Sequence, residues 1–201
     1  MRIILASQSP RRKKLLKQLG LTFEVIPSAI EEHSLETDPV KIVEDLADQK
    51  ALSVGTSCSN SFVIGSDTIV VFEDKILGKP KDHDEASKML NKLSGEQHTV
   101  YTGVSLLVTD EQSSVKKSVK FSVATKVHFS TLEQAEIDAY IKTGSPMDKA
   151  GSYGIQDDWG ATFVEKIDGD FYNVVGLPIN KLYSELKNNF PEIVKTLPIN
   201  C

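Results

Sequence analysis

The first twenty residues constrain the fold most, because they have the pattern of a strand, a short turn and a helix. The segment Arg2–Ala6 is an apolar run of strand length. Ser9 then stands at an N-cap position and Pro10 at the first helical position, where its missing N–H costs nothing. Leucines recur at helical spacing as far as Gly20, a typical helix stop. The pattern predicts that the chain begins with a βα unit.

Strands and helices are expected to alternate along the rest of the chain. Strands are predicted at 62–72, 98–108 and 115–129, and helices at 39–54, 82–93 and 131–143, the last with Thr131 and Gln134 as a capping pair. Asp168-Gly169 is a hairpin signal, with a strand expected on each side, at 161–167 and 171–175. Alternation combined with long antiparallel pairs predicts an α/β fold around a mixed sheet, as a single domain over residues 1–201.

Composition narrows the class of protein. Apolar residues make up 40% and charged residues 25% of the chain, as in ordinary globular proteins, and the formal net charge of −5 disfavours a surface that coats nucleic acid. No apolar run approaches the length needed to span a bilayer, and the apolar stretch after Arg2 is too short for a signal peptide. Cys58 and Cys201 do not make a disulfide framework. We therefore expect a cytoplasmic protein with two reduced thiols and no nucleic-acid or membrane partner.

The turn after the first strand has the features of an anion site. It brings the hydroxyls of Ser7 and Ser9 to the N-terminus of a helix, where free backbone N–H groups and the helix dipole favour negative charge. Arg11 and Arg12 lie in the first turn, where positive charge is unfavourable to the helix itself unless an anion lies between the two side chains. An ordinary helix start with a solvated basic face is the alternative. We favour a polyphosphate ligand.

Asp67 stands out within the apolar run 62–72, which has the composition of a buried central strand. Strand alternation places it on one face with Val63 and Ile69, where a carboxylate is costly unless it is paired or bound to a metal. Either the strand breaks at Gly65 and Asp67 caps a turn, or Asp67 is functional. A carboxylate beside bound phosphates can hold Mg²⁺ or deprotonate a water molecule.

Lys50 lies on the apolar stripe of the helix expected at 39–54, four residues from both Leu46 and Val54. Its side chain either extends to water or presents a compact ammonium to a phosphate.

Three further segments carry weaker signals. Glu31 and Glu32 offer carboxylates to Mg²⁺ from a loop. Lys79 follows Gly78, but a proline stands where a P-loop requires Ser or Thr, so a P-loop NTPase is excluded. Gln156 ends a glycine-rich segment that begins at Asp148, and its amide can match the N–H and carbonyl of a uracil or thymine edge. A packed turn with an exposed glutamine is the alternative.

Taken together, these segments resemble the Maf family of nucleotide pyrophosphatases in order and spacing. The resemblance rests on residues 6–12, 31–32, 65–68, 78–80 and 148–156, and it ends with Val175-Gly176-Leu177-Pro178. It implies a mixed twisted sheet flanked by helices with a deep cleft, similar to inosine triphosphate pyrophosphatase, and often a homodimer. The implied reaction is cleavage of a nucleoside triphosphate between the α- and β-phosphates with Mg²⁺ or Mn²⁺. The segment 149–156 resembles the branch that acts on dTTP and UTP.

The resemblance also implies roles for single residues. Asp67 matches the proton acceptor, and Arg11, Thr68 and Gln156 match positions linked to base specificity. Residues implicated in phosphate or metal handling are matched by Ser7, Arg12, Glu32, Lys50 and Lys79. We expect Ser9, at the helix start, to join the phosphate contacts, Glu32 to bind the metal, and Asp67 to act either as the base or as a second metal ligand. Ser66 is a departure, because alanine is usual there. The alternatives are a nucleotide-sensing regulator of septum formation and cell division without enzymatic activity, and a purine-type (ITP or XTP) pyrophosphatase.

Overall fold

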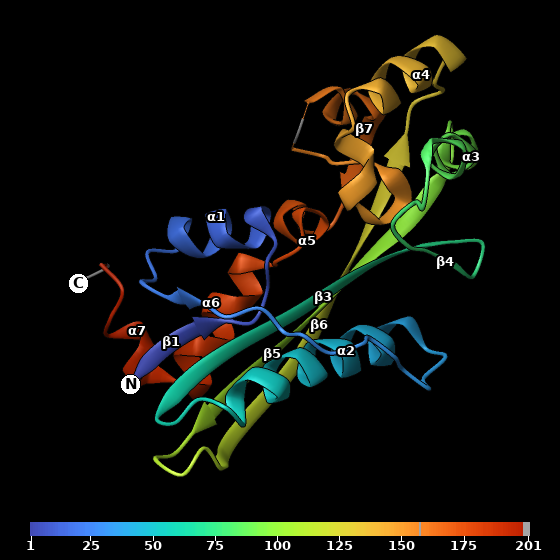
Figure 1. Cartoon of the computed structure of the whole chain (residues 1–201). Coiled ribbons are helices and arrows are strands. Elements are labelled where there is room, and N and C mark those ends of the chain that lie inside the picture. Colours follow the sequence, from blue (N-terminus) through green and yellow to red (C-terminus); the bar gives the residue numbers. More distant parts are fainter. Residues whose placement is uncertain (157, 199–201) are drawn as a thin grey trace. The chain divides into compact units, whose positions relative to one another are not determined.

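The computed structural model describes residues 1–156 and 158–198. Its strands are β1 (Arg2–Leu5), β2 (Glu24–Val25), β3 (Ser61–Phe72), β4 (Lys75–Leu77), β5 (Gln97–Thr109), β6 (Val115–Phe129) and β7 (Val164–Asp168). Its α-helices are α1 (Pro10–Gln18), α2 (Pro39–Gly55), α3 (His83–Leu93), α4 (Gln134–Lys142), α5 (Phe171–Val175), α6 (Ile179–Asn189) and α7 (Pro191–Val194), as Figure 1 shows. Short 3₁₀ helices are η1 (Ser145–Asp148), η2 (Ala150–Ser152) and η3 (Asp158–Phe163).

The sheet is mixed, as predicted. Within the described part of the chain, seven strands pair in the order β2-β1-β3-β5-β6-β7, and β4 pairs with β3. β1 is parallel to both β2 and β3, whereas the β3–β4 and β6–β7 pairs are antiparallel. Parallel pairing of β1 with its neighbours requires crossover connections, which α1 and α2 supply.

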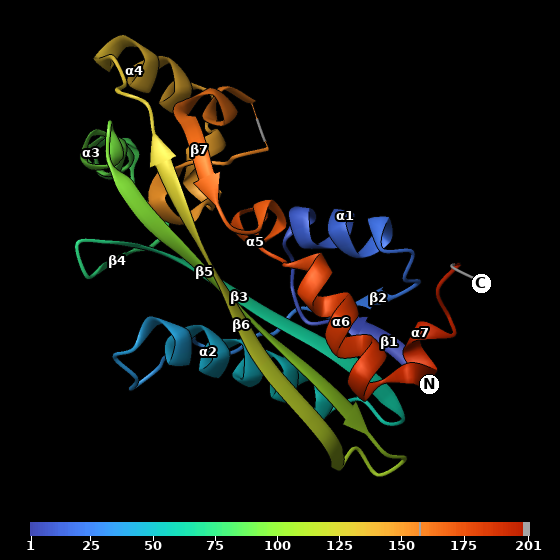
Figure 2. The same ribbon diagram turned by 180° about the vertical axis from the view of Figure 1, so that it is seen from behind.

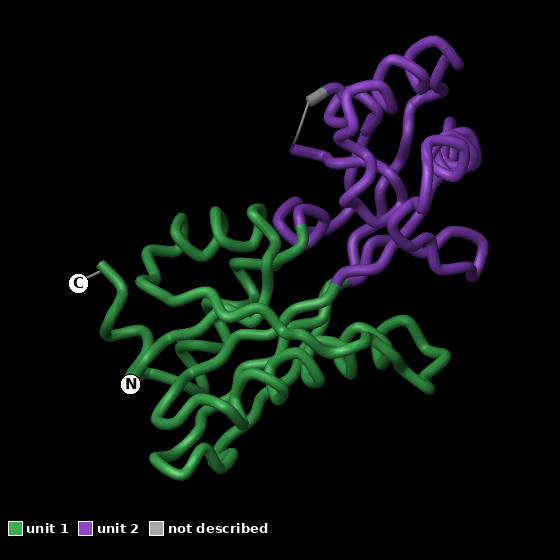
Figure 3. The backbone as a smooth tube through the Cα atoms, viewed as in Figure 1, with its two compact units in different colours: residues 1–67, 102–123, 176–201 green, residues 68–101, 124–175 purple. Residues whose placement is uncertain are grey.

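The chain packs as two compact units (Figure 3). Unit 1 contains residues 1–67, 102–123 and 176–201, and unit 2 contains residues 68–101 and 124–175. Three of the four unit boundaries fall inside β3, β5 and β6, each of which is one uninterrupted strand, and the fourth follows α5. Because these strands run through both units, we keep the single domain over residues 1–201 as a proposal.

In unit 1, helix α2 lies along one face of the sheet (Figures 1 and 2), and its backbone comes unusually close to two strands. A Cβ atom at Gly65 of β3 would lie 2.2 Å from the carbonyl oxygen of Ala47, and one at Gly103 of β5 would lie 2.1 Å from that of Val43. Only glycine allows the helix backbone to approach both strands so closely. This fit fixes the height and register of α2 over β3, and therefore the position of Lys50.

Unit 2 has its own apolar core, formed where α3 and α4 pack on the strands. Leu90, Leu93, Ile137, Tyr140 and Phe129 belong to one buried cluster. The rings of Phe129, Tyr153, Phe163 and Tyr140 meet edge to face, a geometry that aromatic pairs prefer. Unit 2 therefore has a core independent of α2 and β1.

Two local predictions are wrong. The hairpin expected at Asp168-Gly169 is absent, because Phe171–Val175 forms helix α5 after β7. Asp170 caps this helix, accepting hydrogen bonds from the backbone N–H groups of Tyr172 at 2.7 Å and Asn173 at 3.3 Å. Helix α4 begins after Glu133, not Thr131, because Glu136 accepts a hydrogen bond from the N–H of Glu133 at 2.8 Å. In both places a nearby acidic side chain captures the free N–H groups of a helix start.

Cys58 is a buried free thiol, whereas Cys201 lies outside the described residues. Among the helices that the structure describes, none combines the length and the apolar character that crossing a membrane requires.

Candidate active site

The turn between β1 and α1 has the predicted cap. Ser9 is the N-cap residue, and its hydroxyl accepts a hydrogen bond from the N–H of Arg12 at 3.4 Å. The hydroxyl of Ser7 accepts from the N–H of Ser9 at 3.2 Å and is itself buried. Both hydroxyls therefore lie at the N-terminus of α1, as the sequence predicts.

Arg12 is held on two sides. Its Nε donates to the carbonyl oxygen of Gly176 at 2.9 Å, and its Nη1 donates to the Ser7 hydroxyl at 3.2 Å. Ser66, on β3, donates from its hydroxyl to the same Gly176 carbonyl at 3.3 Å. The guanidinium is thus fixed by a backbone group 164 residues away in sequence. Sequence reasoning identified the motif around Gly176 but missed this contact.

The electrostatic surroundings of Arg12 are mixed. Burial lowers the pKa of its guanidinium, the Asp67 carboxylate opposes that change, Arg11 reinforces it, and Glu32 opposes it more weakly. An arginine keeps its charge in a protein in spite of such a shift. Arg12 is therefore a fixed cation that interacts electrostatically with both predicted metal ligands.

Lys50 joins the two predicted metal ligands. Its Nζ lies 2.6 Å from Oδ1 of Asp67 and 2.9 Å from Oε2 of Glu32. The side chains of Lys50 and Asp67 are each 10% exposed, whereas that of Glu32 is 50% exposed. Burial of either ion alone would be costly, and here each ion neutralises the charge of the other. Three residues from α2, β3 and the loop before α2 therefore form one charged cluster.

This geometry decides between the alternatives that the sequence left open. β3 runs without interruption from Ser61 to Phe72, so Asp67 is a strand residue and does not cap a turn. Lys50 is buried and paired with Asp67, so its side chain does not extend to water. Gly65 does not break the strand, because its role is to admit helix α2.

Three predicted site residues belong to unit 2. Thr68 directly follows Asp67 along β3 and is half-buried, Lys79 is exposed, and Gln156 is half-buried. A backbone hydrogen bond of 3.1 Å from the N–H of Gly151 to the carbonyl of Gly78 ties the segment that carries Gln156 to the one that carries Lys79. The two motifs, far apart in sequence, are therefore neighbours within one unit.

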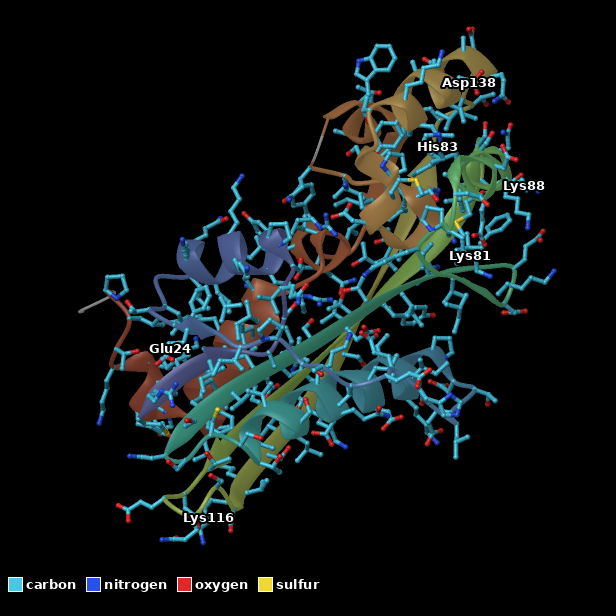
Figure 4. The ribbon with its side chains drawn as sticks, in the orientation of Figure 1. Glu24, Lys81, His83, Lys88, Lys116 and Asp138 are labelled. Carbon is cyan, nitrogen blue, oxygen red and sulfur yellow. The ribbon has the colours of Figure 1, made fainter. Side chains whose placement is uncertain are left out.

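Lys79 also lines a pocket of about 400 Å³ between β4 and α3. Apolar side chains, one glutamate (Glu85) and four lysines line it, and two of these lysines, Lys81 and Lys88, are labelled in Figure 4. The pocket places Lys79 among other cations on the surface of unit 2.

Sequence reasoning missed a buried pair that anchors the Gln156 segment. Nε2 of His98 lies 2.7 Å from the hydroxyl of Tyr153, and the two rings pack edge to face. Burial lowers the pKa of His98 to about 4, reinforced by the charge of His128, and burial raises the pKa of Tyr153. Both groups are therefore neutral near pH 7. A histidine and a tyrosine 55 residues apart gave no sequence signal.

The carboxylates suit a hard divalent cation. In the part of the chain that the structure describes, no group of three or more His, Cys, Asp or Glu side chains could hold a metal ion by itself. Glu32 and Asp67 nevertheless converge on one cation, the Lys50 ammonium. Mg²⁺ is typically held by one or two carboxylates together with substrate phosphates. Two protein carboxylates therefore fit a metal that shares its coordination with a ligand.

The fold and this site define an α/β protein with a basic helix N-terminus and a cluster of two carboxylates around an ammonium. The chain belongs to the Maf-like protein family, because a family model with that description matches residues 2–189. A dTTP/UTP pyrophosphatase of Thermoanaerobacter pseudethanolicus is 53% identical over 191 residues, covering 94% of this chain and 97% of that relative. A dTTP/UTP pyrophosphatase of Bacillus cereus is 51% identical over 187 residues, covering 92% and 94%.

Two solved structures are similar to this chain at low sequence identity. The Staphylococcus aureus Ham1 protein matches with a TM-score of 0.45 and 15% identity, covering 65% of this chain and 72% of that one. A nucleoside-triphosphatase / dITP/XTP pyrophosphatase from Mycobacterium abscessus matches with a TM-score of 0.41 and 11% identity, covering 99% and 100%.

Proposed function

We propose that this chain hydrolyses dTTP and UTP between the α- and β-phosphates, releasing the nucleoside monophosphate and pyrophosphate as a housekeeping step for the nucleotide pool. The observation that carries the proposal is the buried Asp67 carboxylate paired with Lys50, beside the fixed cation Arg12. The two dTTP/UTP pyrophosphatases described above, about half identical over nearly the whole chain, support the substrate assignment.

In the proposed reaction, Asp67 orients a water molecule and takes its proton. The water oxygen forms a bond to the α-phosphorus as the bond from that phosphorus to the α–β bridging oxygen breaks, and the bonding electrons leave with pyrophosphate. Arg12 and Lys50 stabilise the charge that moves onto the leaving group, because fixed cations act most strongly where charge develops. Ser7, Ser9 and Lys79 complete the phosphate contacts in this proposal.

Glu32 and Asp67 would hold Mg²⁺ or Mn²⁺, and the ion would supply polarisation of the phosphoryl oxygens. Arg11, Thr68 and Gln156 are proposed to determine base specificity. The Gln156 amide offers one donor and one acceptor to the base edge. A cytoplasmic location and a homodimer are part of the same proposal, and light scattering on the purified protein tests the dimer.

The deciding experiment measures pyrophosphate release from dTTP, UTP, CTP, ITP and XTP with Mg²⁺ or Mn²⁺. It compares the unmodified chain with Asp67→Asn and with a control, Asp138→Asn, at an exposed position labelled in Figure 4. We expect selective turnover of dTTP and UTP. Loss of the general base should reduce kcat of Asp67→Asn at least about a hundredfold, and the control should be unchanged.

Turnover confined to ITP and XTP would contradict the pyrimidine assignment. Nucleotide binding without turnover would contradict hydrolysis and favour a regulator. Full activity of Asp67→Asn would contradict the role of that carboxylate.

A further inference from the structure

The Lys50 ammonium bridges the two carboxylates that would hold a divalent cation. Its Nζ lies within 2.9 Å of an oxygen from each predicted metal ligand, Glu32 and Asp67. A carboxylate pair that is already joined by one cation is not an open site for another. A metal ion can use both oxygens only after the ammonium has moved away.

The charges around this cluster also disfavour the binding of a free divalent ion. Arg12 interacts electrostatically with Asp67, Arg11 and Glu32. Together with Lys50, these side chains carry three positive and two negative formal charges, which sum to +1. Such a site repels a bare divalent ion and attracts an anion. A nucleoside triphosphate with one divalent ion bound remains an anion, whereas the free ion is a dication.

A bound triphosphate would give the Lys50 ammonium alternative anionic partners. Its backbone is fixed, because α2 is seated on β3 and β5 through Gly65 and Gly103. Only the flexible four-carbon stem can redirect the ammonium. A triphosphate bound near Arg12 would offer new anionic oxygens to Nζ and release the two carboxylates.

We propose that Lys50 excludes free divalent ions from Glu32 and Asp67, so that the chain takes up metal and triphosphate together, as a metal–nucleotide complex. The inference rests on the proposed function for the identity of the nucleotide. It concerns binding alone, and it is tested without turnover.

The first test titrates Mn²⁺ into the nucleotide-free chain and follows bound Mn²⁺ by electron paramagnetic resonance. The variants are Lys50→Met, which keeps most of the length of the side chain and removes its charge, and Lys41→Met, at an exposed position on the same helix. Removing a cation in contact with both ligands should tighten Mn²⁺ binding of Lys50→Met at least about tenfold. Lys41→Met should match the unmodified chain. Equal Mn²⁺ affinity in all three proteins would overturn the proposal.

A second measurement on the unmodified chain keeps the test decisive if Lys50→Met does not fold. Calorimetry compares Mn²⁺ alone, a non-hydrolysable α,β-imido dUTP analogue with EDTA, and the preformed Mn²⁺–analogue complex. We expect the complex to bind at least about tenfold more tightly than either component alone. Mn²⁺ alone binding as tightly as the complex would overturn the inference, and so would the metal-free analogue doing so. A chain that hydrolyses dTTP but fails these tests refutes only this inference.

Discussion

Each unit buries a pair of polar side chains. The two pairs avoid an uncompensated buried charge in different ways. In unit 1 the Lys50–Asp67 pair is charged on both sides and separated by 2.6 Å. In unit 2 the His98–Tyr153 pair is uncharged at neutral pH, because burial holds the pKa of His98 at about 4 and raises that of Tyr153. In the first pair each charge compensates the other, whereas in the second pair burial suppresses ionisation.

The difference matches what each pair is positioned to do. Charges kept at a buried site can act on an ionic ligand, and Lys50 and Asp67 lie beside the fixed guanidinium of Arg12. A neutral hydrogen-bonded pair gives rigidity, and His98 joins β5 to the segment that ends at Gln156. The charged pair can therefore act on an ionic ligand, whereas the neutral pair fixes the position of a backbone segment.

Breaking the charged pair should have the largest effect on stability. In Lys50→Met the Asp67 carboxylate stays buried without its cation, which typically costs about 3–5 kcal/mol. Urea unfolding at pH 7.5 checks this against Lys41→Met, which should stay near the unmodified protein. A loss below about 1 kcal/mol would show that water solvates Asp67, and it would remove the contrast between the units.

The neutral pair should appear as a pH dependence of stability. The folded-state pKa of His98 lies near 4, below the ordinary value of 6.5, so the unfolded chain binds more protons between these values. Stability therefore falls as the pH decreases from 6.5 towards 4, by up to about 3 kcal/mol from this group.

His98→Gln keeps a hydrogen-bonding side chain but does not titrate, so its stability should fall less over this pH range. Urea unfolding at several pH values, with His83→Gln at an exposed position as the control, measures the difference. Parallel curves for the unmodified protein and His98→Gln would contradict a buried neutral histidine.

Ser66→Ala should have the smallest effect on stability. It tests whether Ser66 belongs to the same network as the charged residues of unit 1. The variant loses the 3.3 Å hydrogen bond to Gly176, but that carbonyl keeps its bond from Arg12. We expect a loss of about 1 kcal/mol in urea unfolding and no change in Ser57→Ala, an exposed control. A loss above about 3 kcal/mol would mean that Arg12 depends on Ser66 and belongs to one network with it.

Much of the local structure was predictable, because short-range rules decide it. The cap at Ser9 and the strand containing Asp67 follow from N-cap chemistry and β-branched composition. The hairpin at Asp168-Gly169 was wrong because Asp170 caps a helix immediately afterwards, and two valid local signals competed there.

The site was predictable as a set of residue types but not as a set of contacts. Lys50 and Asp67 were each identified as out of place in an apolar pattern, yet nothing in the sequence paired them with each other. Their meeting depends on Gly65 and Gly103, which lower α2 onto the sheet. The contact from Arg12 to Gly176 likewise joins opposite ends of the chain.

The sequence by itself determined the α/β pattern, the Maf-like family and the residues that carry charge where an apolar neighbour was expected. Only the tertiary structure decided that Lys50 lies between Glu32 and Asp67, and that His98 stays neutral beside Tyr153. The physical reason is the distance along the sequence over which each effect acts. Periodicity and capping act over a few residues, whereas burial and pairing depend on groups that the packed sheet brings together from distant parts of the chain.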